Sequence, residues 1–451
     1  MAGKTYITDF TQGSVPRHLL IFSAPLFLSN LLQVVYNMVD MIIVGNRYGK
    51  VGLSAVSVGG DVTNFLTFLA IGFANAGQVI IAKYIGAGRR DKLSRFVGTM
   101  SAFLFACAAT LSVLGLIFRK EILALMNTPA ASFSGAMAYS TVCMAGLVFI
   151  YGYNIVSAVL RGMGDSKHPF VFISIAAVLN LVLDVVFVYT FDMGPFGAAL
   201  ATVMSQAVSF ICCTAFLIKN RERFELAFDA ADFTKWDRGM LSDLVKLGTP
   251  MAIKSASVQF SKLFVNSWIN SYGTAVSGFA GIANKIGSIS NLVSAAMNTA
   301  GSTMMGQNLA ARKYDRAVGI MRALAKVTLS AAAVISLVIV IFPSQVFRIF
   351  TSDAEVLALG GRYVPIAVLL FFGAACRAIM NALINGSGNY KVNFATAILD
   401  GIVMRIGLAL LFGLALGMKH YGFWLGDALA GFTPFWVGLI FYFSGKWKKE
   451  E

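Results

Sequence analysis

The sequence predicts an all-α integral membrane protein with twelve transmembrane helices in two pseudo-symmetric six-helix bundles around a central cavity. Hydrophobic residues make up 57% of the 451 residues and charged residues only 13%. The mean hydropathy is +0.74. A soluble protein would carry about 25% charged residues. Apolar runs of roughly 20 residues, the length of a helix that crosses a bilayer, recur along the whole chain.

The apolar runs define the predicted helices in order. We place them near residues 17–41, 52–81, 95–118, 134–160, 169–190, 196–218, 245–269, 275–304, 319–342, 356–384, 393–416 and 421–444. The polar stretch 219–244 lies between the sixth and seventh helices and is predicted to be a cytoplasmic linker. The predicted domains are therefore an amino-terminal bundle, residues 1–218, and a carboxy-terminal bundle, residues 245–451.

The basic residues between the predicted helices indicate the orientation. The two chain ends and the loops on their side carry 24 Lys and Arg residues, and the opposite loops carry 7. Loops rich in Lys and Arg stay in the cytoplasm, so both termini are predicted to be cytoplasmic. The net charge of +15 therefore reflects membrane topology, and no nucleic-acid partner is expected.

An internal repeat relates the two halves. Residues 47–58, 82–93 and 160–167 resemble residues 271–282, 306–317 and 384–391, each 224 positions later. Pro25 similarly matches Pro250 at a spacing of 225. Collinear matches at nearly one spacing indicate a duplication. With six helices per copy the copies run parallel, and transporters built from such repeats bind their substrate near the midplane between the halves.

Two carboxylates lie inside long apolar segments, Asp40 and Asp184. A charge at bilayer depth costs at least ~2.5–3.5 kcal/mol on insertion scales, so such residues usually face a cavity and take part in an ion or proton pathway. Asn180 lies about one turn before Asp184. Carboxylate and amide oxygens suit a hard cation such as Na⁺, and two neighbouring carboxylates also suit a shared proton. The alternative is a single structural Asp bonded to the backbone.

The first helix has a polar face. Gln33, Tyr36, Asn37 and Asp40 are spaced by 3, 1 and 3 residues and share one side of a helix. They predict a functional cavity, and the alternative is a polar stripe that only joins helices. Pro25 lies earlier on the same helix, where proline frees a backbone carbonyl and permits a bend.

The interior charges of the two halves differ in sign. The first half has Asp40, Asp61 and Asp184 in its spans, and the second half has Lys254, Lys262, Lys285, Arg377 and Arg405 against Asp400 and Asp427. Lys254, Gln259 and Lys262 share a broad face of the seventh helix and are predicted to line the cavity. The alternative for Lys254 is that its ammonium reaches the membrane surface. Arg405 is expected to pair with Asp400 or Asp427.

Five segments carry a family resemblance. They are PLFLSNLLQVVYNMVDMIIVG at 25–45, AKYIGAGRRDK at 82–92, VLRGMGDSKHP at 159–169, GQNLAARKYDRA at 306–317 and NGSGNY at 385–390. Together they resemble the multidrug and toxic compound extrusion (MATE) transporters along almost the whole chain. The resemblance implies two six-helix bundles that form a V around a central cavity. It also implies export of organic cations and other amphiphiles in exchange for Na⁺ or H⁺.

The sequence looks closest to the DinF-like branch of that family, whose coupling ion binds in the amino-terminal bundle. This resemblance implies an ion-coupling site, with the same residues as Na⁺ ligands, at Asp40, Asn180, Asp184 and Thr202. It also implies cavity-lining roles for Gln33, Tyr36 and Asn154 and a bending role for Pro25. The NorM-like branch instead uses acidic residues in the carboxy-terminal bundle, where this chain has Lys254, Lys262 and Arg377.

We expect a secondary active multidrug efflux transporter, not an enzyme, that works by H⁺ or Na⁺ antiport and alternating access. Its predicted substrate cavity comprises Gln33, Tyr36, Asn37, Asn154, Lys254, Gln259 and Lys262. The alternative is a flippase for lipid or lipid-linked substrates. The expected partners are small amphiphilic or cationic substrates and membrane lipid, with no cofactor other than the coupling ion. We expect a monomer in the plasma membrane of a bacterium or archaeon.

Overall fold

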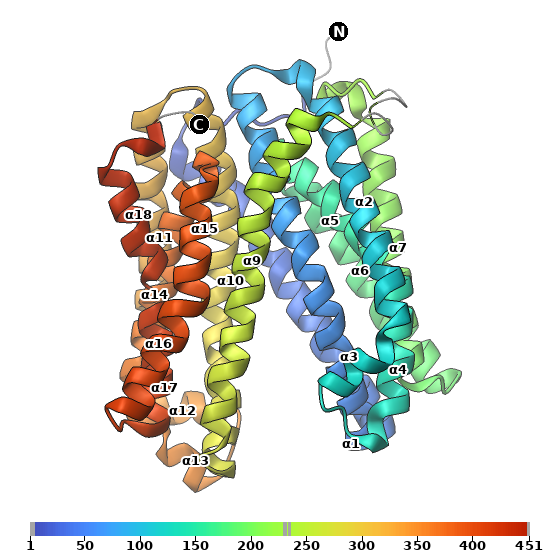
Figure 1. Cartoon of the computed structure of the whole chain (residues 1–451), viewed down its shortest axis with the longest axis vertical. Helices are drawn as coiled ribbons and strands as arrows, with labels where there is room; N and C mark the ends of the chain where they lie inside the picture. The colour runs from blue at the N-terminus through green and yellow to red at the C-terminus, as the bar shows by residue number, and fades with distance from the viewer. Residues whose placement is uncertain (1–4, 229–231, 233–235, 449–451) are drawn as a thin grey trace. The chain divides into compact units, whose positions relative to one another are not determined.

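The computed structural model describes residues 5–228, 232 and 236–448. Over these residues the chain is helical and contains no β-strand (Figure 1). The predicted linker 219–244 is described only in part, because residues 229–231 and 233–235 lie outside the described residues. The chain forms two compact units. Unit 1 contains the residues through Thr8 and Leu28–Gly248, and unit 2 contains Asp9–Phe27 and the residues from Thr249 onward.

Unit 1 is built from long apolar helices. They are α1 (Val15–Gly86), α2 (Leu93–Ile117), α3 (Arg119–Leu125), α4 (Ala130–Ala145), α5 (Leu147–Gly162), α6 (Lys167–Asp184), the π-helical turn η2 (Val185–Thr190) and α7 (Gly194–Lys219). Helix α1 is two helices joined at Gly49, whose φ of 61° and ψ of −153° are not helical. The first of these helices begins among residues of unit 2 and enters unit 1 at Leu28.

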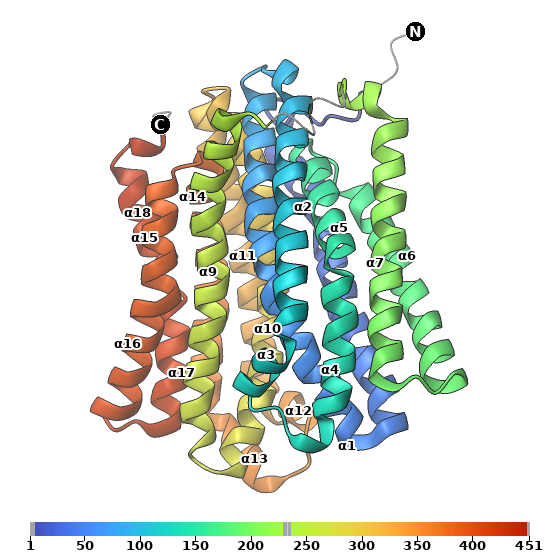
Figure 2. The ribbon, with the colours of Figure 1, turned by 45° about the vertical axis from the view of Figure 1, so that its right-hand side comes forward.

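Unit 2 repeats this plan. Helix α9 (Arg238–Asn270) begins in unit 1 and enters unit 2 at Thr249. The other helices of unit 2 are α10 (Thr274–Ala310), α11 (Tyr314–Ile341), α12 (Pro343–Arg348), α13 (Ala354–Ala358), α14 (Gly360–Ser387), α15 (Tyr390–Ile398), α16 (Met404–Leu410), α17 (Lys419–Ala430) and α18 (Thr433–Phe443). Two π-helical turns, η4 (Leu399–Val403) and η5 (Leu411–Ala415), lie before and after α16. Both views show α15 and α16 running on in one line (Figure 2).

The number of long helices agrees with the number of predicted spans. Within the described ranges, eight helices are long and apolar enough to cross a membrane, and the pair α4 and α5, bent by 49°, forms a ninth. The break at Gly49 divides α1 into two, and the long but less apolar α9 and α10 bring the number to the predicted twelve. The first predicted helices were too short, because α1 remains helical through residue 48 and resumes directly after Gly49.

The duplication is visible in the backbone. Residues with a left-handed φ recur 224 or 225 positions apart: Gly49 and Gly273, Gly88 and Arg312, Gly164 and Gly388, Asp192 and Gly417, and Gly194 and Lys419. A positive φ is uncommon outside glycine, so matched positions of this kind mark equivalent helix ends. The two halves therefore share one fold, although the polar residues inside them differ.

The segment before Leu28 packs within unit 2. The Phe10 N–H donates to Gln307 Oε1 at 2.8 Å, and Asn308 Nδ2 donates to the Phe10 carbonyl at 3.1 Å. The Phe10 ring is buried in the same hydrophobic cluster as Leu19 and Met304. Buried aromatic surface and backbone hydrogen bonds together explain why residues 9–27 belong to unit 2.

Candidate functional site

Unit 1 encloses an acidic cavity of about 280 Å³. Six of the predicted site residues line it: Gln33, Tyr36, Asn37, Asp40, Asn154 and Thr202. The four positions on α1 therefore share one face, as their spacing predicted. Asp61 lines the cavity as well, and its described lining residues include no Lys or Arg. This wall favours a cation.

Asp40 is the most enclosed acidic residue of that wall, with a relative exposure of 3%. The Thr202 hydroxyl lies 3.3 Å from Asp40 Oδ2 and 3.0 Å from the Ala198 carbonyl, and it can donate to one of them at a time. Gln206 Nε2 donates to the Tyr36 hydroxyl at 3.5 Å. Gln206 was not predicted, although its place one turn after Thr202 puts it on the same side of α7.

Asp184 is fully buried at the end of α6, directly before the π-helical turn η2. Its carboxyl group lies near enough to the Asp40 carboxyl, 144 residues away in sequence, for the charges of the two groups to interact. Two ionised carboxylates are both acceptors, so a hydrogen bond between them forms only when one carries a proton. Neither oxygen of Asp184 has a hydrogen-bond partner among the described residues. π-Helical turns often occur at functional sites.

Asn180 completes the group. Its side chain is 3% exposed, and neither its amide nitrogen nor its oxygen has a hydrogen-bond partner within the described chain. It borders a small void together with Tyr36, Thr202 and Gln206. Buried polar groups are nearly always paired. The unpaired oxygen of Asn180 and the two carboxyl groups therefore suit a bound proton or small cation. In the described residues no group of three or more His, Cys, Asp or Glu side chains could hold a metal ion.

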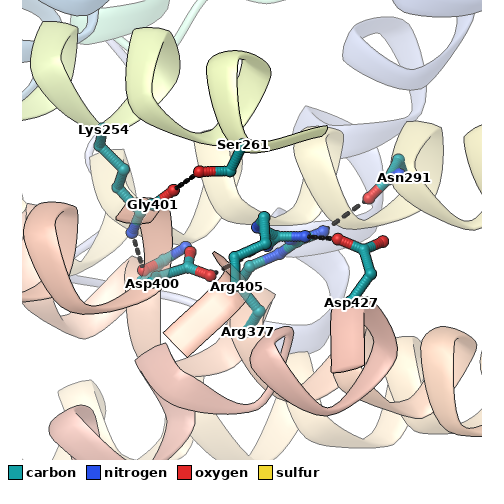
Figure 3. Close-up of polar contacts among 9 residues, drawn as sticks. Lys254, Ser261, Asn291, Arg377, Asp400, Gly401, Arg405 and Asp427 are labelled. Atoms are coloured by element: carbon teal, nitrogen blue, oxygen red, sulfur yellow. Dashed lines mark hydrogen bonds and ion pairs between the residues drawn. The ribbon is translucent and has the colours of Figure 1, made fainter. Parts of the chain in front are cut away.

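Unit 2 contains a different polar group (Figure 3). Arg405, only 2% exposed, donates to Asp400 Oδ1 at 3.0 Å and also to Asp427 Oδ1. The arginine thus pairs with both of its candidate partners. Helix α17 can bring Asp427 to Arg405 because Gly426 packs closely on α16, where an added Cβ would lie 2.4 Å from the Ala409 nitrogen.

Two further cations of unit 2 are bonded to amides (Figure 3). Lys254 Nζ donates to Asn381 Oδ1 at 2.6 Å, and Arg377 Nη2 donates to Asn291 Oδ1 at 2.6 Å. Asn381 and Asn291 were not predicted, and an uncharged amide in an apolar helix offers only a weak sequence signal. Lys254 is therefore held by Asn381 of α14.

A second cavity, also about 280 Å³, lies within unit 2. Gln259 and Lys262 line it, together with Asn291, Trp424 and Asp427. Lys254 is not among its lining residues. The seventh predicted helix therefore places Lys262 on the cavity and Lys254 behind it.

Pro25 lies inside α1, three residues before unit 2 gives way to unit 1 at Leu28. A helix-interior proline leaves the carbonyl four residues earlier without its usual backbone donor and permits a bend. The proline thus lies beside the point where the first helix passes from one compact unit to the other.

Comparison with known proteins relates both halves to one family. The MatE family model matches residues 25–186 and 250–423. The chain is 29% identical over 441 residues to the probable multidrug resistance protein YpnP of Bacillus subtilis, covering 98% of this chain and 97% of the relative. It is 25% identical over 453 residues to the probable multidrug resistance protein NorM of Thermotoga maritima, covering 99% and 96%.

Solved structures share the fold. A MOP superfamily transporter from Pyrococcus furiosus has a TM-score of 0.90 at 22% identity, over 99% of both chains. A crystal structure of MATE in complex with MaD3S has a TM-score of 0.88 at 22% identity, over 98% of this chain and 99% of that one. The family match spans most of both halves and the solved structures share the fold, so this multi-pass membrane protein belongs to the MatE family of multidrug and toxic compound extrusion transporters.

Proposed function

We propose that this chain is a secondary active exporter of organic cations and other amphiphiles, driven by H⁺ or Na⁺ through Asp40 and Asp184. The observation that carries the proposal is the pair of buried carboxyl groups beside an acidic cavity within one unit. Membership of a multidrug transporter family supports the class of substrate.

The carboxyl pair formed by Asp40 and Asp184 can be fully ionised, share a proton or bind Na⁺. Two unit charges about 4 Å apart repel by about 4 kcal/mol at an effective dielectric constant of ~20, so a buried pair strongly favours holding one cation between them. A proton shared by Asp40 and Asp184 removes one charge. Na⁺ would use the same carboxylates with the oxygens of Asn180 and Thr202, which lie in the same group.

Exchange of substrate for ion follows because the cationic substrate and the coupling ion compete for the Asp40 carboxylate. Its carboxyl group faces the cavity beside Tyr36 and Asn37, and it also interacts with Asp184. A cationic substrate against this wall is attracted by the ionised form of Asp40. Protonation or Na⁺ binding reduces that attraction, so uptake of the ion favours release of the substrate.

Pro25 would connect ion binding to movement. The polar face of α1 and Pro25 lie on one continuous helix, with Asp40 about four turns after the proline. A change of charge at Asp40 alters which contacts of α1 are favourable, and the proline lowers the cost of bending between them. Alternating access would then use the first helix as the moving element.

We also propose the orientation and assembly expected from the sequence: both termini in the cytoplasm, a monomer, and residence in the plasma membrane of a prokaryotic cell. The distribution of Lys and Arg between the alternate loops supports the orientation. A variant in which Cys107, Cys143, Cys212, Cys213 and Cys376 are all replaced would test it, with single cysteines introduced into the loops and labelled in intact cells. Labelling of residue 445 by an impermeant reagent from outside intact cells would contradict it.

Efflux from proteoliposomes tests the transport proposal. Vesicles with purified protein are loaded with ethidium, and either a pH gradient or a Na⁺ gradient is imposed. Gradient-driven efflux should occur with one of the two ions and should be lost in Asp40→Asn. Asp91→Asn, which changes an exposed carboxylate on the short turn Arg90–Lys92, is the matched control. Normal driven efflux in Asp40→Asn would remove this residue from the mechanism.

A further inference from the structure

We propose that the cavity of unit 2 binds the anionic head of an amphiphile, a carboxylate or a phosphate, with Lys262 as the contacting cation. The inference deepens the proposed export function, on which its physiological meaning rests, by adding a substrate class opposite in charge to that favoured by the acidic cavity of unit 1. Binding itself needs neither a gradient nor the carboxyl pair.

The charges of unit 2 do not balance. Arg405 lies between Asp400 and Asp427, so these three groups together carry one excess negative charge (Figure 3). Lys254 and Arg377 donate hydrogen bonds to uncharged amides. Lys262, half-buried on the cavity wall, has no hydrogen-bond partner among the described residues. Three cations thus face one excess anion, and buried charge without a counterion is unfavourable.

One amide on the cavity wall, that of Asn291, is oriented to donate. Arginine has only hydrogen-bond donors, so the oxygen of Asn291 must face Arg377. The Asn291 amide nitrogen is then left for the cavity, which Asn291 lines. Gln259 and Asn266 supply further amides on the same wall as Lys262. Together these residues present one free ammonium and several N–H donors, which is the chemistry that a carboxylate or phosphate requires.

The only carboxylate on the described cavity wall does not oppose this assignment. Asp427 is held by Arg405, which is itself fixed from the other side by Asp400. The neighbouring backbone is held to α9, because the Ser261 hydroxyl donates to the carbonyl of Gly401 beside Asp400 (Figure 3). Asp427 is therefore already paired with a cation before any ligand enters.

The remaining wall suits an apolar body. Trp424, Tyr363 and Leu370 line the cavity, and the rings of Trp424 and Tyr363 pack edge-to-face at 5.3 Å. A volume of about 280 Å³ lies just below the range of roughly 300–1,000 Å³ for small-molecule sites. The cavity therefore accepts a head group with a bicyclic ring, and a longer apolar tail would have to extend beyond it.

Equilibrium binding to the full-length protein in phosphatidylcholine nanodiscs tests the proposal. Isothermal titration calorimetry compares 1-naphthyl phosphate and 1-naphthoate with 1-naphthylmethylammonium, which has the same ring and the opposite charge. Lys262→Gln should weaken both anions roughly 10- to 100-fold, since a hydrogen bond to a charged group is lost. Lys262→Arg should restore most of the affinity. The ammonium probe should bind no more weakly to Lys262→Gln than to the unchanged protein.

Lys326→Gln is the matched control, because Lys326 is exposed on α11 and lies outside the lining of the cavity. Unchanged anion affinity in Lys262→Gln would overturn the proposal, as would an equal loss in Lys326→Gln. If Lys262→Gln is not monodisperse, Ser288→Trp provides a second test, because a tryptophan at this lining position fills the cavity without changing its charge. Undiminished anion binding in Ser288→Trp would equally overturn the assignment.

Two further experiments complete the test. The first distinguishes a lipid from a dissolved amphiphile as the source of the anion, and the second distinguishes the anion-binding proposal from the ion-coupling proposal. Phosphatidylglycerol added to the nanodiscs should compete with 1-naphthyl phosphate if a lipid head group is the natural occupant, and should not compete if it is a dissolved amphiphile. Either result supports an anion site. Asp40→Asn should bind 1-naphthyl phosphate normally, so failure of ion coupling and failure of anion binding appear in different variants.

Discussion

Replacing Asp184 by asparagine tests the carboxyl pair directly. Asp184 is fully buried, and its carboxyl group interacts with that of Asp40. Asparagine has nearly the same shape and can donate a hydrogen bond to Asp40, so Asp184→Asn imitates a permanently protonated residue. It also removes a group that costs at least ~2.5–3.5 kcal/mol to place at bilayer depth when charged. The variant should fold as well as the unchanged protein.

The expected effect is loss of linkage between ion and substrate. Allosteric coupling free energies are typically about 1–3 kcal/mol, which changes an affinity by roughly 5- to 150-fold. In the unchanged protein, the affinity for tetraphenylphosphonium should fall by a factor in that range when protons or Na⁺ occupy the pair. In Asp184→Asn the factor should fall below about 2, the size expected when a ligand no longer distinguishes the two states.

Equilibrium binding of labelled tetraphenylphosphonium measures this factor. Nanodiscs are titrated at acidic and alkaline pH, with and without Na⁺, for the unchanged protein, Asp184→Asn and Asp192→Asn. Asp192 is an exposed loop carboxylate whose pKa is lowered by hydrogen bonds from Tyr48 and Arg47, so its variant controls for a surface charge. Retention of the full ion dependence in Asp184→Asn would refute the reasoning, because the coupling ion would then act through residues other than the carboxyl pair.

Three other outcomes are expected. Thr202→Ala removes the hydroxyl 3.3 Å from Asp40 and should weaken the ion dependence of substrate binding by about 0.6–1.7 kcal/mol. This loss should be smaller than that caused by Asp184→Asn. An ion dependence equal to that of the unchanged protein would exclude Thr202 from the site. Pro25→Ala should slow efflux per folded molecule while equilibrium ion binding persists; normal turnover with a lowered melting temperature would instead assign Pro25 a packing role. Arg405→Leu leaves two buried carboxylates uncompensated and should destabilise unit 2 by about 3–5 kcal/mol, measured by thermal unfolding in detergent against Arg322→Leu on α11.

The sequence by itself determined the features that depend on local pattern. Apolar runs of sufficient length predicted the twelve helices, since each helix satisfies its own backbone hydrogen bonds in the bilayer. The period of 3.6 residues placed Gln33, Tyr36, Asn37 and Asp40 on one face, and all four line the cavity of unit 1. The repeat spacing of 224 residues predicted the shared fold, which the recurring left-handed positions confirm.

Only the tertiary structure decided which distant side chains meet. Hydropathy does not encode that Asp40 contacts Asp184, or that Arg405 pairs with both Asp400 and Asp427. These contacts depend on how closely and at what rotation neighbouring helices pack, which small residues such as Gly426 set.

The same reason separates the two lysines of α9. Lys254 and Lys262 are eight residues apart on one broad face, yet Lys262 lines the cavity while Lys254 is held by Asn381 of α14. Residues 9–27 likewise join unit 2 through the buried Phe10 and its bonds to α10, although they lie in the first half of the sequence. Local sequence specifies a helix and its polar face, whereas the partner of each polar group is specified by side chains that lie far away along the chain.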